Sequence, residues 1–221
     1  IVKRILVEND RAIGVELMNP KKGINQLKAC KEVILSAGAF NSPQLLMLSG
    51  IGAKEELVEH GIEVVKELPG VGKNLHDHLM PVISAATKQQ KGLNHGIKPL
   101  NQLKDLLKYT LTNSGPLTIG ILEAVAFLNI DGKDAPANFQ FQFAPMHAGE
   151  GYGRDIYDLS TLPTYDGFTI LPCLLDPKSR GYVKIRSTNP LDAPIIQPNF
   201  LKEEEDLQAL LKGTKLALKI M

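Results

Sequence analysis

The sequence predicts a chain of two structural classes, an α/β segment followed by an α+β segment. An unbroken apolar run at residues 33–35 leads through small residues into a helical pattern, which is typical of a parallel-sheet unit. After about residue 83, strand-like segments alternate apolar and polar residues, as antiparallel sheets with one covered face do. The 221 residues are 43% hydrophobic and 22% charged, an ordinary globular composition. We therefore expect two domains, over residues 1–83 and 84–221.

The first segment opens with a predicted antiparallel meander. Residues 1–7 and 12–18 should pair as strands across a polar turn, and residues 26–30 should add a third strand. The run Val33-Ile34-Leu35 lacks polar alternation and suits a strand covered on both faces.

A short helix should follow this run. Ser42 is the expected N-cap, Pro43 the first helical residue, and Gly50 the left-handed residue that ends the helix. Beyond it we expect a second helix over residues 54–60 and a strand over residues 62–65.

The second segment should build an antiparallel sheet with helices. Phe139, Phe141 and Phe143 alternate with glutamines, which predicts one buried and one polar face. The expected strands cover residues 123–128, 138–143, 168–175 and 181–186, and the expected helices cover residues 100–111 and 203–221.

Charge and cysteine content exclude several classes of protein. Lys and Arg number 25 and Asp and Glu number 24, so no global field indicates nucleic acid or an anionic membrane as a partner. No apolar run approaches the ~18 residues of a membrane span. Two cysteines, Cys30 and Cys173, are too few for a disulfide scaffold; separate thiols are favoured over a single bridge.

Both ends of the chain indicate a fragment of a longer protein. The sequence opens on Ile1, inside a strand pattern, without an initiator methionine or a signal peptide. It stops at Met221, inside a helical pattern without a cap.

Three loops carry candidate chemistry. The small residues Ser36-Ala37-Gly38 follow the expected buried strand, where a dinucleotide can approach the backbone; a tight turn of any α/β protein is the alternative. His76-Asp77-His78 suggests a metal, a polar loop or a cofactor neighbour. We predict no metal, because a site needs three or four ligands and the other histidines are isolated in sequence. The turn 176–181 is favoured as solvated over phosphate-binding, and no nucleophile–base pair stands out.

Read together, these segments resemble the glucose–methanol–choline (GMC) family of flavin oxidoreductases. The stretch GAFNSPQLLMLSGIG at 38–52 fits a signature of that family, and LPGVGKNLHDH at 68–78 matches its next shared segment. PKSRG at 177–181, followed by VKIRS at 183–187, is similar to the start of its C-terminal region. NSGPLT at 113–118 most resembles the insect glucose dehydrogenase branch.

The resemblance implies a fold, a cofactor and contacts to it. A partial Rossmann-like FAD-binding domain would be followed by an incomplete substrate domain with an antiparallel sheet, its C-terminal region beginning near residue 177. The cofactor would be FAD. Its expected contacts are Val2, through its backbone to the adenine, and Ser36, Ala37 and Gly38 along the dinucleotide. Asn74 and His78 would lie near the flavin or at the domain junction.

The implied activity is oxidation of a CH–OH group by hydride transfer to flavin N5, from an alcohol or sugar, glucose being favoured. The partners would be that substrate and a quinone-like electron acceptor, and the protein would be secreted. The catalytic histidine is expected downstream of Met221 and the glycine fingerprint upstream of Ile1. We therefore predict no catalytic residue in this chain, which alone should be inactive. An FAD-containing lyase and a non-enzymatic relative remain alternatives.

Overall fold

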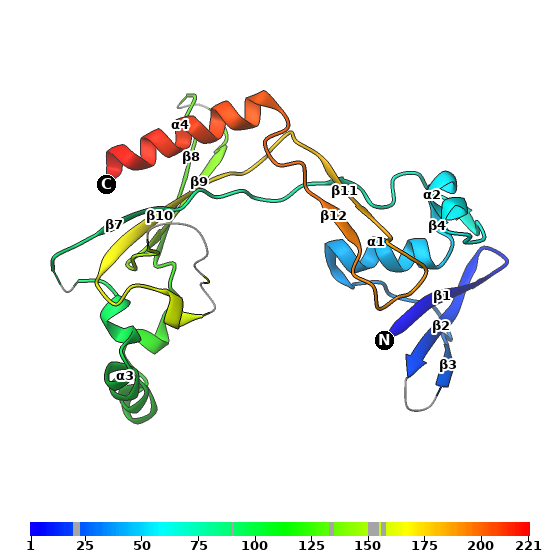
Figure 1. Ribbon diagram of the computed structural model, residues 1–221, viewed down its shortest axis with the longest axis horizontal. Helices are drawn as coiled ribbons and strands as arrows, with labels where there is room; N and C mark the ends of the chain where they lie inside the picture. Colours follow the sequence, from blue (N-terminus) through cyan, green and yellow to red (C-terminus); the bar gives the residue numbers. More distant parts are fainter. Residues whose placement is uncertain (20–22, 90, 133–134, 150–154, 156–157) are drawn as a thin grey trace. The chain divides into compact units, whose positions relative to one another are not determined.

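A computed structural model describes residues 1–221 except 20–22, 90, 133–134, 150–154 and 156–157. The chain forms two compact units (Figure 1): residues 1–77 with 179–202, and residues 78–178 with 203–221. The first unit thus ends six residues before the expected boundary at residue 83, and segment 179–202 returns to it. Which unit binds cofactor and which binds substrate remains a prediction.

The first unit contains the expected antiparallel meander. Strands β1 (Val2–Glu8), β2 (Arg11–Asn19) and β3 (Gly23–Lys28) form a sheet in that order. Asn9 and Asp10 join β1 to β2 with φ of 50° and 59°, the left-handed geometry that two-residue hairpins favour.

Helix α1 (Gly38–Leu48) starts earlier than expected. Ala37 is its N-cap, and Pro43 lies inside the helix, so the prediction of Ser42 as the cap was wrong. The Ser42 hydroxyl instead accepts a hydrogen bond from the backbone N–H of Ala37 at 3.1 Å, which closes the turn before the proline. The predicted helix end is confirmed, since Gly50 follows with φ of 80°.

The remainder of the first unit surrounds a small core. Met47, Leu57 and Ile185 are buried together, and Leu57 comes from the expected second helix, α2 (Lys54–Glu59). The remaining strands are β4 (Ile51–Gly52), paired in parallel with β5 (Lys66–Glu67), and the antiparallel set β12 (Ile195–Gln197), β11 (Gly181–Lys184) and β6 (Lys73–Leu75).

Two strand predictions in this unit were wrong. Residues 33–35 form no strand, and Ile34 is 79% exposed, because no described strand lies beside them to complete a ladder. The strand expected over residues 62–65 is displaced to β5, after Val65.

The second unit contains an antiparallel sheet with three of the four predicted strands. The strand at residues 83–86 was not predicted, and the strand expected over residues 181–186 is β11 of the first unit, where it pairs with β12 and β6. Its strand order is β7 (Ile83–Ala86), β10 (Gly167–Leu174), β9 (Phe139–Ala144) and β8 (Ala124–Leu128). Phe139 and Phe141 are buried, as the alternation predicted, and helix α4 (Glu204–Ile220) packs against β10. The other helices are α3 (Pro99–Thr112) and the 3₁₀ turns η1 (Asn94–Ile97), η2 (Pro116–Thr118) and η3 (Leu159–Thr161).

Cys30 is exposed and Cys173 is buried, and the two form no disulfide. Across the part of the chain that the structure describes, no helix is both long and apolar enough to cross a membrane.

Candidate functional site

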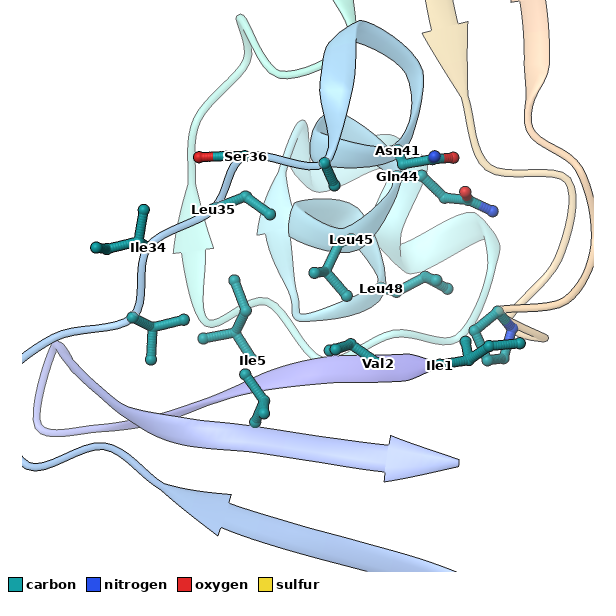
Figure 2. A pocket seen from close by; sticks show the side chains of 14 residues that line it. Ile1, Val2, Ile5, Ile34, Leu35, Ser36, Asn41, Gln44, Leu45 and Leu48 are labelled. Atoms are coloured by element: carbon teal, nitrogen blue, oxygen red, sulfur yellow. The ribbon is translucent and has the colours of Figure 1, made fainter. Parts of the chain in front are cut away.

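A cavity of about 570 Å³ lies in the first unit, between β1, the segment leading to α1, and α1 itself (Figure 2). In Figure 2 the side chains of Leu45 and Leu48 on α1 approach Val2 on β1. The side chains or backbone of fourteen residues line it: Ile1, Val2, Ile5, Val15, Val33, Ile34, Leu35, Ser36, Ala37, Asn41, Gln44, Leu45, Leu48 and Pro190. The cavity therefore brings together three of the predicted cofactor contacts, Val2, Ser36 and Ala37.

Strand β1 offers its backbone to this cavity along a free edge. The carbonyl of Ile1 accepts a hydrogen bond from the N–H of Met18 on β2 at 2.9 Å. Because backbone polar groups alternate sides along a strand, the N–H and C=O of Val2 fall on the opposite, free edge. Further along that edge, the N–H of Ile5 donates to the Ser49 hydroxyl at 2.8 Å, which ties β1 to the end of α1.

An ion cluster fixes the backbone beside Val2. The strand register shifts between Val2 and Arg4, so Lys3 and Arg4 both reach the buried Glu16 on β2, at 3.0 and 2.5 Å. The hydrogen bond from Lys3, with support from Arg4, holds the pKa of the Glu16 carboxyl below its ordinary value despite burial. The bulge is thereby anchored by side chains that lie outside the cavity lining.

The predicted glycines divide between two roles. Gly38 opens α1 with φ of 89°, and a Cβ placed there would meet no atom within 4 Å. At Gly50, by contrast, a Cβ would lie 2.4 Å from the carbonyl oxygen of Glu63. Gly50 is therefore required by the chain's own packing, whereas Gly38 has open space around it and does not line the cavity.

The lining suits binding more than proton transfer. Most lining side chains are aliphatic, and none of them is ionisable. The polar members are Ser36, Asn41 and Gln44, and the Gln44 amide is oriented by donating to the carbonyl of Asp192 at 2.8 Å. Aliphatic walls can hold a flat heterocycle, and the backbone groups of a free strand edge can form hydrogen bonds with the polar atoms at the edge of its ring.

The other two predicted contacts lie elsewhere. Asn74, in β6, is exposed with φ of 59° and does not line the cavity. His78 belongs to the second unit, where its Nε2 lies 3.3 Å from the carbonyl oxygen of Leu175. Among the described residues, no group of three or more His, Cys, Asp or Glu side chains is arranged to hold a metal.

The turn at 176–181 is held by the protein itself. The backbone N–H of Lys178 donates to Oδ1 of Asp206 at 2.8 Å. Sequence reasoning missed Ile5, Gln44 and Leu45 as cavity residues, because aliphatic and amide residues in ordinary elements carry no sign of function.

Two family models, both described as GMC oxidoreductase, match residues 1–80 and 177–221 and together cover more than half of the chain. The chain is 38% identical to alcohol dehydrogenase [acceptor] of Pseudomonas putida, over 96% of the chain and 38% of that relative. It is 37% identical to mitochondrial choline dehydrogenase of Homo sapiens, over 100% of the chain and 36% of that relative. It is 33% identical to glucose dehydrogenase [FAD, quinone] of Drosophila pseudoobscura pseudoobscura, over 99% of the chain and 35% of that relative.

A solved structure of formate oxidase aligns with a TM-score of 0.84 at 27% identity, over 98% of the chain and 41% of that enzyme. A pyridoxine 4-oxidase aligns with a TM-score of 0.76 at 22% identity, which shows a shared fold. The chain thus spans less than half the length of the relatives it matches.

Proposed function

The chain belongs to the GMC oxidoreductase family, and we propose that the whole protein is an FAD-dependent oxidoreductase acting on CH–OH groups. FAD is the cofactor of this family, as the sequence led us to expect. Bound FAD supplies the acceptor for the hydride that leaves the alcohol carbon.

The observation that carries the proposal for this chain is the cavity at Val2, Ser36 and Ala37. We assign it to the adenosine end of FAD. The free edge of β1 at Val2 would hydrogen-bond the rim of the adenine, and Leu45 and Leu48 would pack against its plane. Open space at Gly38 would let the cofactor continue past the start of α1. We propose that Asn74 and His78 lie nearer the flavin than this cavity does.

Glucose remains our preferred substrate and a quinone our preferred acceptor. Support comes from the relative named glucose dehydrogenase [FAD, quinone], while other relatives are named for choline or alcohol. We propose that the protein is secreted, on the same resemblance to the insect branch. Another relative, choline dehydrogenase, is named as mitochondrial. The alternatives to an oxidoreductase within this family are an FAD-containing lyase and a non-enzymatic relative.

An absorbance spectrum of the full-length protein, purified natively, tests the activity. We expect flavin bands that bleach when glucose is added without oxygen; choline and a simple primary alcohol serve as parallel substrates. Bleaching by choline or the alcohol alone would keep the oxidoreductase and reject glucose. Bands that persist with all three would favour the lyase. A colourless protein that FAD cannot reconstitute would reject the proposal.

A matched pair of variants tests the cofactor assignment. Ala37→Leu places a large side chain in the cavity lining, whereas Ala39→Leu places it on the exposed first turn of α1, outside the lining. We expect Ala37→Leu to lower the flavin-to-protein ratio at least tenfold and Ala39→Leu to leave it unchanged. Equal ratios in the two variants would remove this cavity from the FAD site.

A further inference from the structure

Helix α3 presents an exposed leucine face, although it carries the pattern of a buried amphipathic helix. Leu100 is 75% exposed and Leu111 is 81% exposed, and none of the fourteen helical residues is buried. Three more leucines, at 103, 106 and 107, are each exposed over at least half of their surface. With 3.6 residues per turn, all five fall on one side of the helix.

The helix is attached to its unit by its polar side. Asn101 donates to the carbonyl of His95 at 2.7 Å, and Gln102 donates to the carbonyl of Ile97 at 2.6 Å. Asp105 is half-buried, with Oδ2 3.5 Å from the position that a Cβ on Gly96 would take. The most extensive contacts of α3 are with η1 and η2, and Figure 1 shows it at the end of this unit, away from the sheet. Since these polar residues hold the helix, the leucines face outward.

The charge beside the leucine face has one sign. Lys104 and Lys108 are exposed and follow one margin of the face, and Lys98 precedes the helix. Asp105, the acidic residue of the helix, is turned toward η1. Exposed charge on α3 is therefore cationic, a local asymmetry that the net charge of +1 for the whole chain conceals.

We propose that α3 is a membrane-docking helix, which lies in the headgroup region of an anionic lipid surface with its leucines in the acyl layer. A leucine face bordered by lysines is the pattern of helices that bind in the plane of a bilayer. The lysine stems can follow the apolar face while their ammonium groups reach lipid phosphates. Docking of this kind needs no membrane-spanning helix and does not depend on the proposed enzymatic reaction.

Vesicle binding by the full-length protein tests the proposal. We expect co-sedimentation with vesicles of phosphatidylcholine and phosphatidylglycerol, and weaker binding to phosphatidylcholine alone. Lys104→Gln with Lys108→Gln should lower the partition coefficient about fivefold per lysine, with a smaller dependence on salt. Leu103→Glu with Leu107→Glu should lower it by more than about tenfold per leucine.

Leu218→Glu is the matched control, because Leu218 is an exposed leucine of α4 in the same unit. It should bind vesicles as the unchanged protein does. Equal binding by the Leu103/Leu107 variant and this control would overturn the proposal, as would absence of binding by the unchanged protein.

Hydrogen exchange over residues 99–112 provides a second readout that needs no variant. We expect amides on α3 to exchange readily in solution and to become protected when anionic vesicles are added. Protection without lipid would overturn the proposal. If that protection depends on protein concentration, a second copy covers the leucines; if it does not, another segment of the same polypeptide does.

Discussion

Helices α3 and α4 have similar sequence patterns but differ in how much of their surface is buried. Both belong to the second unit, and both alternate leucines with lysines at helical spacing. Helix α4 buries Leu210 and Ala217 against the sheet, whereas α3 buries no residue. An amphipathic pattern therefore specifies a helix with an apolar face, and the neighbours of the helix determine whether that face is covered.

The contact that distinguishes α4 is a close approach to β9. A Cβ on Gly213 would lie 2.4 Å from the ring of Phe139, so the helix and strand meet where the helix has no side chain. Helix α3 has no glycine and rests on hydrogen bonds to the carbonyls of η1. Five predictions test this difference, from the largest expected effect to the smallest.

Phe139→Ala should lower the free energy of unfolding by about 3–5 kcal/mol, because this fully buried ring fills the space under α4. Leu107→Ala on α3 should lower it by less than about 0.5 kcal/mol, since that side chain is about half exposed. Urea unfolding of the full-length protein measures both. Similar losses for the two variants would mean that α3 is covered as α4 is.

Gly213→Val should lower the stability by about 1–3 kcal/mol, because the added side chain overlaps the fully buried ring of Phe139. Thermal unfolding monitored by circular dichroism measures the change. The control is Leu211→Val on the exposed side of α4, expected to shift Tm little. An unchanged Tm for Gly213→Val would contradict the close packing of α4 on β9.

Asp166→Asn should loosen α3 and leave α4 in place. The buried carboxylate of Asp166 accepts hydrogen bonds from the N–H groups of Gly92 and His95, at 2.9 and 2.8 Å, and so holds the turn on which α3 rests. We expect a cost of about 1–3 kcal/mol and faster hydrogen exchange in residues 92–112 than in α4. Uniformly faster exchange over the whole unit would show that the two helices are not held separately.

The same carboxylate predicts a pH dependence. Burial raises the pKa of Asp166, but the N–H groups of His95 and Gly92 and the His95 ring lower it further, so the pKa lies below its ordinary value of 3.8. The stabilisation is therefore complete above pH 3.8 and is lost as the pH falls through the depressed pKa of the folded protein. The stability of the Asp166→Asn variant should fall less across this range than that of the unchanged protein.

Lys212→Met should have the smallest effect. Lys212 on α4 pairs with Asp131, and both side chains are more than half exposed. Exposed ion pairs contribute little, because water and salt screen them and two long side chains must be ordered. We expect no measurable change in Tm at moderate salt. A clear loss would mean that this pair, in addition to the Phe139 contact, holds α4 on its unit.

Most of the secondary structure was predictable because local pattern determines it. The meander at β1–β3, the sheet alternation at Phe139 and Phe141, and both amphipathic helices follow from periodicity and turn residues. The strand at residues 33–35 was not, because an apolar run becomes a strand only when another strand pairs with it. The start of α1 was misplaced because the Ser42 hydroxyl bonds backward to Ala37 instead of capping Pro43.

The candidate site likewise has some features that follow from the sequence and others that only the fold decides. The sequence by itself determined the GMC family and the cofactor, because the signature residues 38–52 are contiguous in the chain. The contacts Val2, Ser36, Ala37 and Gly38 follow from the family resemblance and stay a prediction. The tertiary structure alone decided that Val2 presents a free strand edge, that Ile5 and Leu45 complete the cavity, and that the leucines of α3 face outward. These features depend on which segments meet in space, and local sequence does not encode the neighbours of a face.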